Sequence, residues 1–408
     1  MRPPAATSAP CSDISEADVS KGRLIAIDAG TLFTPEKKYS PGRLLIEGAT
    51  VAALGAPESV PIPSGADRLD ASQWFVTPGF IEPHIHGCGG VDVMDGSWES
   101  VNTVSRLLVR HGTTSFLPTT VSSPPDVLSH AVEQLGAALS QPFDGATPLG
   151  IHLEGPFISA AKRGTHKASN VLAPNVDLID KWTRASGNRI RLMTIAPELE
   201  GTDALLIMAR HHGVIVAMGH SDATFDQAKG AADRGVCYAV HTFNAMRAMN
   251  HRDPGIVGEV LADDRVWAEI IVDGIHVDPA LVRVFARSKG KSLVLLVTDA
   301  ISATDMPDGR YALGGDTVEV ANGICRDSEG RLAGSTLTQE VALKNFVEWT
   351  DWTFQDALFG LTLNPARALK LEKKGILEPG ADADVLIMNA QFRVLKTLVG
   401  GNIVFERF

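Results

Sequence analysis

Eight short runs of apolar, strand-forming residues recur through the middle of this 408-residue chain. They read FIEPHIH, TTSFLPTT, LGIHLEG, IRLMTIAPE, VIVAMGH, CYAVHTF, WAEIIVDG and LVLLVTDA. Amphipathic stretches of helical length separate most of them, for example SWESVNTVSRLLVRHG after the first. Strands that alternate with helices form parallel βα units, and eight such units close into a barrel. We therefore predict an α/β fold whose main domain, residues 78–370, is a (β/α)8 TIM-like barrel.

The two ends of the chain have a different pattern. Residues 23–77 and 371–408 contain short or alternating apolar segments with Gly and Pro turn signals and no long helix. This pattern suggests that both ends combine in one small β-sandwich domain. Residues 1–22 are rich in Pro, Ala, Ser and acids and lack the apolar core of a signal peptide, so we expect a disordered tail and a cytoplasmic protein. No stretch is apolar enough to predict a membrane span.

Charge and cysteine content exclude some classes of function. The net charge of −11 argues against a nucleic-acid partner, because binding to phosphate backbones needs accumulated Lys and Arg. A small phosphorylated substrate senses only the local field and stays possible. The four cysteines are widely spaced without a CxxC motif, so neither a zinc knuckle nor a disulfide framework is indicated. We interpret Cys88, two residues after His86, as a small buried residue and not as a metal ligand.

Potential metal ligands follow the apolar runs. His84 and His86 are two apart on one strand and therefore share a face, while Glu154, His220 and His241 end later strands. Because catalytic residues of such barrels gather at the carboxyl ends of the strands, we expect these five side chains to meet. Neutral imidazoles and a carboxylate hold a divalent ion and leave a position for water. The sequence predicts a hydrolytic metal centre for Zn, Fe, Mn or Co.

Asp299 follows the last apolar run and has two interpretations. It could cap the next helix, or it could be a general base that takes a proton from metal-bound water and returns it to the departing amine. Its position opposite the ligands favours the second. His152 shares a strand face with Glu154, and we place it behind the ligands. We interpret the remaining histidines of helices and loops as solvated or packing residues: His111, His130, His211, His212 and His251.

Nine segments in order along the chain carry a family resemblance. PGFIEPHIHGCGG, HLEGPF, KRGTHK, MGHSDAT, HTFNAM, HRDPGIVG, DGIHV, LVTDAI and LAGSTLT resemble the signature segments of N-acetylglucosamine-6-phosphate deacetylases, a branch of the amidohydrolase superfamily. The resemblance implies metal-dependent hydrolysis of N-acetyl-D-glucosamine 6-phosphate to D-glucosamine 6-phosphate and acetate, with metal-bound hydroxide as the nucleophile. It also supports a domain built from both chain ends.

The resemblance bears on the number of metals as well. Related hydrolases often bridge two ions with a carbamylated lysine after the fourth strand, but that strand here reads MTIAPE and has no lysine. Glu154 is the available anionic bridge. Some deacetylases of this family lack the HxH pair and keep one metal, so the presence of His84 and His86 favours two. We expect Glu154 to be shared, with His84 and His86 on one ion and His220 and His241 on the other.

Substrate contacts are implied by the resemblance alone. The matching positions are Thr165, His166, Asn244, Ala245, Arg252, His276, Leu332, Ala333 and Gly334. Arg is the preferred fork-shaped donor to phosphate, although Arg252 could instead pair with Asp253. In the family the equivalent arginine reaches the substrate of the neighbouring subunit, which implies a homodimer.

Two alternatives remain open. The galactosamine epimer could be the substrate, since no single residue reports on the orientation of one ring hydroxyl. The chain could also be a catalytically silent scaffold with an amidohydrolase fold. A scaffold should have lost ligands, whereas this chain keeps all five and Asp299.

Overall fold

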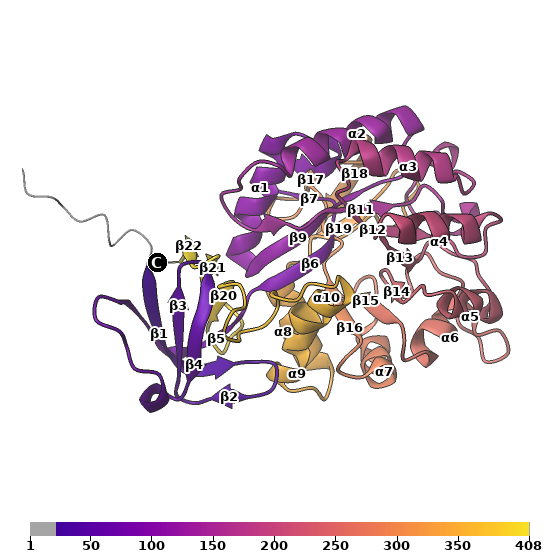
Figure 1. Cartoon of the computed structure of the whole chain (residues 1–408). Helices are drawn as coiled ribbons and strands as arrows, with labels where there is room; N and C mark the ends of the chain where they lie inside the picture. Colours follow the sequence, from indigo (N-terminus) through magenta and orange to yellow (C-terminus); the bar gives the residue numbers. More distant parts are fainter. Residues whose placement is uncertain (1–21, 408) are drawn as a thin grey trace, which may run out of the picture.

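The structure, a computed structural model, describes residues 22–407. All but the last residue of the predicted tail lie outside these described residues. Figure 1 shows a barrel surrounded by helices, with a smaller sheet of strands beside it. The barrel is built from the middle of the chain, and the smaller sheet takes strands from both ends.

All eight strands predicted for the barrel are present. They are β6 (Phe80–Ile85), β9 (Thr113–Thr120), β11 (Ile151–Glu154), β12 (Ile190–Ile195), β13 (Ile215–Met218), β14 (Tyr238–Ala239), β15 (Trp267–Ile271) and β16 (Val294–Val297). Each pairs in parallel with the next along the chain. A two-residue strand, β10 (Thr147–Pro148), adds to the edge of β9. The fold class is therefore the predicted one.

The barrel closes between β6 and the residues that follow β16. Ile85 bridges Ala300 in parallel, and the N–H of Asp299 donates to the carbonyl of His84 at 3.1 Å. The buried carboxylate of Glu82 links the two segments further, because it accepts hydrogen bonds from the N–H groups of His84 and Thr298 at 3.1 and 3.0 Å. The first and last strands thus bring His84 and Asp299 next to each other.

Helices connect the strands and cover the barrel (Figure 1). They are α1 (Trp98–Leu108), α2 (Pro125–Ala138), α3 (Val176–Ala185), α4 (Thr202–His211), α5 (Phe225–Asp233), α6 (Gly255–Ala262), α7 (Pro279–Lys289) and α8 (Gln339–Trp349), followed by α9 (Phe354–Leu358) and α10 (Leu363–Ala368). Strands such as β13 and β16 are fully buried, as expected where helices cover one face and the barrel core the other.

The barrel interior is a packed apolar core. Side chains from alternate strands, including Leu117, Leu192 and Leu295, form one cluster with Ala366 of α10 and Leu369. Because α10 belongs to this cluster, it plugs the amino-terminal end of the barrel. The opposite end, where the strands finish, is left for the functional site.

The smaller sheet combines the two ends of the chain. Its strands run in the order β22 (Asn402–Glu406), β21 (Val394–Val399), β20 (Val385–Met388), β5 (Asp67–Pro78), β1 (Leu24–Phe33), β3 (Gly42–Glu47) and β4 (Thr50–Gly55), with β2 (Lys38–Tyr39) on β1. The sheet folds over, since Thr50 at the start of β4 bridges Asp382 just before β20. A separate apolar core fills its interior. The division of the chain at residues 78 and 371 stays a prediction.

A three-stranded antiparallel sheet lies between β16 and α8, and the sequence analysis did not predict it. It consists of β17 (Gly309–Leu313), β18 (Asp316–Ala321) and β19 (Ile324–Arg326). It packs on its own apolar cluster, which includes Val121, Ile301 and Ala333. A short hairpin, β7 (Gly87–Cys88) with β8 (Val91–Asp92), follows β6, and Cys88 there is buried as predicted.

Candidate functional site

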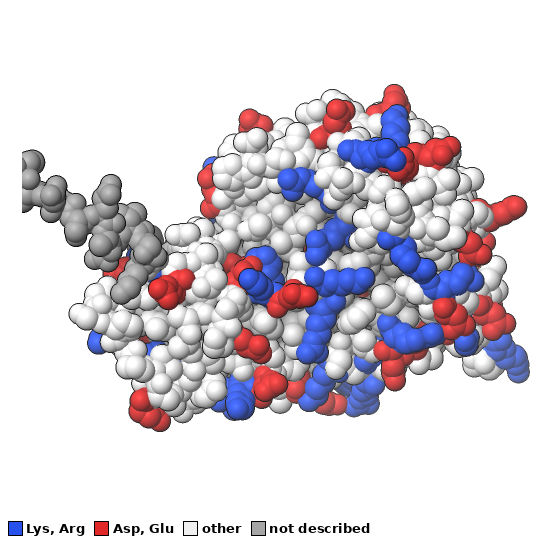
Figure 2. Space-filling view, in the orientation of Figure 1, with Lys and Arg blue, Asp and Glu red and all other residues white. Residues whose placement is uncertain are grey.

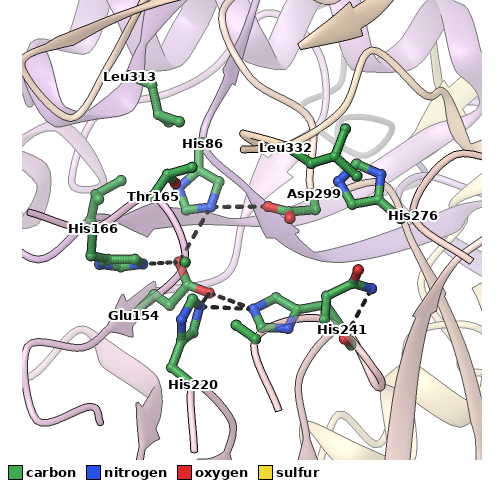
Figure 3. Close-up of a pocket in the computed structure, with 15 residues that line it drawn as sticks. His86, Glu154, Thr165, His166, His220, His241, His276, Asp299, Leu313 and Leu332 are labelled. Atoms are coloured by element: carbon green, nitrogen blue, oxygen red, sulfur yellow. Dashed lines mark hydrogen bonds and ion pairs between the residues drawn. The ribbon is translucent and has the colours of Figure 1, made fainter. Parts of the chain in front are cut away.

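The five predicted metal ligands meet around the carboxylate of Glu154 at the carboxyl end of the barrel (Figure 3). Its Oε1 lies 2.9 Å from Nε2 of His241, 3.2 Å from Nε2 of His220 and 3.3 Å from Nε2 of His84. Its Oε2 lies 3.5 Å from Nε2 of His86. All five side chains are buried. The structure therefore brings together residues from four different strands.

Three of the site residues occupy equivalent places in the fold. His220, His241 and Asp299 each lie two residues after the end of their strand, which are β13, β14 and β16. All three have a positive φ, of 46°, 28° and 50°. Non-glycine residues adopt this left-handed conformation at a cost and concentrate at functional sites. The sharp turn after each strand directs the side chain toward the barrel axis.

Hydrogen bonds fix the orientation of three imidazoles. Nδ1 of His84 lies 2.9 Å from a carboxylate oxygen of Glu269. Nδ1 of His86 lies 3.0 Å from the carbonyl of Thr119, and Nδ1 of His220 lies 3.0 Å from the carbonyl of Lys162. Because carbonyl and carboxylate oxygens only accept, each Nδ1 carries the proton and each Nε2 offers its lone pair to the cluster. This arrangement is typical of metal-binding histidines.

Two buried glutamates beneath the cluster were missed by the sequence analysis. Glu269 on β15 accepts from the Tyr238 hydroxyl at 2.7 Å and from the N–H of His241 at 3.0 Å, in addition to His84. Burial raises the pKa of Glu82 to about 8. Both are charged residues inside an apolar run, in WAEIIVDG and FIEPHIH. A charged residue in such a run indicates a buried carboxylate with polar partners, and this was the available signal.

The cluster fits a divalent metal. The Nε2 atoms of His220 and His241 are 3.1 Å apart, and ligand atoms around a tetrahedral ion with bonds of about 2.0–2.1 Å are separated by about 3.3 Å. Nε2 of His84 is buried and has no hydrogen-bond partner among the described residues. No lysine or arginine in the described chain lines the cavity above Glu154 and Asp299, so these carboxylates have no fixed cation beside them.

The geometry also groups the ligand atoms. Three sets are compact enough to hold an ion: His84, Glu154 and His241; His84, His86 and Asp299; and Glu154, His166 and His220. Asp299 belongs to the second set because its Oδ1 lies 3.1 Å from Nε2 of His86. Nε2 of His84 lies 3.6 Å from the same oxygen.

His166 differs from the ligands in its tautomer. Its Nδ1 accepts from the N–H of Ser122 at 3.1 Å and lies 2.7 Å from the Ser122 hydroxyl. A neutral imidazole that accepts at Nδ1 carries its proton on Nε2, which lies 3.4 Å from Oε2 of Glu154. His166 therefore presents a donor to the cavity, which separates it from the metal ligands.

His152 lies one layer below the cluster, as predicted. Its Nε2 is 2.8 Å from the Thr194 hydroxyl, and its ring centre is 4.6 Å from that of His84. Burial holds its pKa well below the usual value, so the ring is neutral. It supports the ring of His84.

A cavity of about 170 Å³ opens above the cluster. Seven of the nine predicted substrate residues line it: Thr165, His166, Asn244, Ala245, His276, Leu332 and Gly334. Figure 3 shows His276 and Leu332 beside Asp299, with His166 and Thr165 across the cavity. Gly334 has a φ of 60°, and a Cβ there would lie 2.9 Å from the Asp299 carbonyl, so the close approach requires glycine. Leu313 of β17 also lines the cavity and was not predicted.

His276 is oriented by Asp273. Its Nδ1 lies 2.6 Å from Oδ2 of Asp273, and Asp273 Oδ1 accepts from the N–H of His276 at 2.8 Å. Burial would lower the pKa of His276, but the Asp273 hydrogen bond raises it. Its Nε2 is left for an anionic ligand. The sequence analysis missed Asp273, although it lies two residues after β15, at the same place as Asp299 after β16.

Two predicted substrate residues lie outside the cavity lining. Ala333 is buried in the apolar cluster under β17–β19. Arg252 is exposed in the loop before α6. The rival interpretation of Arg252 as a partner of Asp253 is wrong, because Asp253 pairs with Arg247 at 2.6 Å and Arg252 forms no ion pair with any described residue.

Comparison with known proteins identifies the family of the chain. Residues 75–404 match the model of the amidohydrolase family. An N-acetylglucosamine-6-phosphate deacetylase of Lysinibacillus sphaericus is 40% identical over 83% of this chain and 88% of its own. An N-acetylgalactosamine-6-phosphate deacetylase of Escherichia coli O157:H7 is 34% identical over 92% of this chain and 98% of its own. The chain belongs to the amidohydrolase superfamily and is a hydrolase.

Solved structures narrow the assignment. A mutant N-acetyl-D-glucosamine-6-phosphate deacetylase of Mycobacterium smegmatis, in complex with N-acetyl-D-glucosamine-6-phosphate, superimposes with a TM-score of 0.88 at 33% identity. The match covers 94% of this chain and 100% of that chain. Within the superfamily, the chain is a member of the N-acetylglucosamine-6-phosphate deacetylase family. None of the helices in residues 22–407 is long and apolar enough to cross a membrane.

Proposed function

We propose that the chain hydrolyses the acetamide bond of N-acetyl-D-glucosamine 6-phosphate and releases acetate and D-glucosamine 6-phosphate. The observation that carries the proposal is a single cavity that joins the Glu154 cluster to His276. The Glu154 cluster suits amide hydrolysis, and His276 suits a phosphate or sugar oxygen. The family of the relatives supports the choice of substrate.

The proposal includes two divalent ions. Glu154, His220 and His241 would hold one ion, and Glu154, His84 and His86 would hold the other, with Asp299 beside it. When bound, divalent metals lower the pKa of water and polarise a carbonyl oxygen. Zn, Fe, Mn and Co all suit these ligands.

The residues of this chain supply the remaining steps. In the proposed mechanism, Asp299 accepts the proton that the attacking water loses and later delivers it to the departing nitrogen. The Nε2–H of His166 donates to the acetyl oxygen as negative charge develops there. The C–N bond then breaks, the acyl carbon leaves as acetate, and the amine leaves with the sugar phosphate. His276 and Asn244 hold the other end of the substrate.

A homodimer would complete the phosphate site. Arg252 is exposed and unpaired among the described residues, as expected of a side chain that acts on a neighbouring subunit. The apolar side chains of Met249 and Ile275, close in sequence to Arg252 and His276, are 51% and 40% exposed. A cytoplasmic location stays part of the proposal.

The galactosamine epimer is the second candidate, because one relative carries that name. The test is acetate release by the metal-loaded protein from both 6-phosphates at matched concentrations. We expect a higher kcat/KM for the glucosamine compound. A higher value for the epimer would reverse the choice of substrate, and no release from either compound would support a silent scaffold.

A further inference from the structure

The amino-terminal end of the barrel, opposite the active site, carries a cavity of about 410 Å³. It is bordered by the segments before β11, β12 and β13 and by the residues after α10. Strands rise about 3.3 Å per residue, so this cavity lies roughly 15–20 Å from the Glu154 cluster. Nothing in the proposed reaction uses it.

Three cationic residues line this cavity, and one of them, Lys370, also lines a neighbouring cavity that contains Glu36, Glu372 and Glu378. The three are Arg189, Arg191 and Lys370, and the lining of the first cavity contains no Asp or Glu. None of the three forms an ion pair with a residue in the described part of the chain. This is notable in a protein of net charge −11, in which many other Lys and Arg side chains are paired with carboxylates. Figure 2 shows Lys and Arg side chains, with some Asp and Glu beside them, over the region where Figure 1 places α10.

The arginines are held in place before any ligand arrives. The Arg191 guanidinium donates twice to the Leu369 carbonyl, at 3.0 and 3.3 Å, which leaves its other N–H groups free. Arg189 donates to the Ser140 hydroxyl at 3.1 Å. Burial lowers the pKa of Arg191, and no carboxylate offsets that cost. A guanidinium group held in this way loses little conformational entropy when it binds an oxyanion.

The backbone at the cavity is strained as well. Asn188 and Lys370 have positive φ values of 61° and 56°, and both line the cavity. Five other non-glycine residues with positive φ lie in the active-site segments: His220, His241, Phe243, Ala245 and Asp299. Four of these five, all but Phe243, line the active-site cavity.

We propose that this cavity is a second anion site, which binds the phosphoryl group of a small phosphorylated metabolite. A group of two negative charges suits a cavity lined by three cationic residues, and Arg recognises phosphate through paired N–H groups. The volume exceeds what a bare phosphate fills and leaves room for an attached group of sugar size. The inference does not depend on the proposed substrate, since none of these residues belongs to the active site.

The test is calorimetric titration of the metal-loaded protein with inorganic phosphate and, separately, with glucose 6-phosphate, at 150 mM salt to screen weak surface binding. Because the active site is also expected to bind phosphate, the wild-type protein should show two binding events. The variant Arg189→Gln/Lys370→Gln should weaken one event about ten-fold or more and leave the other unchanged. Arg191 is kept, because it also supports Leu369.

The matched control is Lys38→Gln/Lys181→Gln, which removes the same charge from two exposed lysines outside the cavity. It should retain both events. A single event in the wild-type protein, or equal weakening in both double variants, would overturn the proposal. Tighter binding of glucose 6-phosphate than of inorganic phosphate would identify a phosphate ester as the ligand, and equal affinity would identify free phosphate.

Discussion

Nδ1 of His84 donates to the carboxylate of Glu269 across 2.9 Å, and both side chains are fully buried. Glu269 also receives hydrogen bonds from the Tyr238 hydroxyl and the N–H of His241, so all three of its partners are donors. Glu269→Gln would bring an N–H₂ group against one of those donors. We expect the metal affinity to fall about 10- to 100-fold, measured by competition with a chelating dye. Unchanged affinity would show that Glu269 does not orient His84.

Asp299→Asn should retain the fold and metal content and lose most of the turnover. The amide has the shape of the carboxylate but cannot accept a proton. Loss of a general acid–base group typically lowers kcat by about 10²- to 10⁴-fold. Steady-state kinetics, with metal analysis of the same sample, checks this. A near-normal kcat would assign proton transfer to another residue.

Metal content should approach two ions per chain in protein prepared anaerobically. A chelator should abolish acetate release, and adding back one of the suitable divalent metals should restore it. Elemental analysis provides the count. A well-occupied preparation that held one ion, with His84 and His86 free of metal, would refute the binuclear arrangement.

Arg252→Ala should raise KM for the phosphorylated sugar about ten-fold or more, because a charge-assisted hydrogen bond to phosphate contributes roughly 1.5–3 kcal/mol. The weak reaction with unphosphorylated N-acetylglucosamine should change little. That second substrate is the control for a general loss of activity.

Subunit exchange tests where Arg252 acts. Mixing Arg252→Ala chains with Asp299→Asn chains should produce hybrid dimers in which one site has both groups intact. Low-KM activity should therefore reappear. If exchange occurs without recovery, Arg252 acts within its own chain or outside the site.

His111 should make stability depend on pH. Its ring nitrogens lie 2.9 Å from Asp305 and 2.8 Å from Glu340, and these carboxylates raise its pKa to about 9 although burial opposes the shift. Because the pKa of His111 is higher in the folded state, the protonated ring stabilises the fold. This contribution is fully present below the unfolded-state pKa of about 6.5 and is lost as pH rises through about 9. The difference in Tm between the wild-type protein and His111→Gln should thus shrink from pH 6.5 to pH 10. A constant difference would contradict the assignment.

The sequence predicted the barrel well because parallel strands covered on both sides must be apolar along their whole length. Strands such as LVLLV stand out for this reason. It also predicted which side chains converge, because the carboxyl ends of all the strands lie at the same end of the barrel. The interpretation of His111 as a solvated or packing residue was incomplete, because its two acidic partners come from distant segments.

What the sequence could not predict depends on contacts between distant segments. The β17–β19 sheet contributes Leu313 to the cavity, but its strands alternate polar and apolar residues like an exposed hairpin. Asp273 and Glu269 act on His276 and His84, and a carboxylate in a strand gives no sign of its hydrogen-bond partner. The place of Arg252 at a neighbouring subunit rests on the family resemblance.

The shared sheet of the two chain ends has a consequence for how the protein is made. Thr77 pairs with Leu386, and the strand that contains Thr77 leads directly into β6, which carries His84 and His86. During synthesis, β5 leaves the ribosome long before its partner β20 exists, so its edge stays open until translation is nearly complete. We expect nascent chains to depend on chaperones during this interval. Premature stop codons that remove β20–β22 should then send an almost complete barrel to proteolysis.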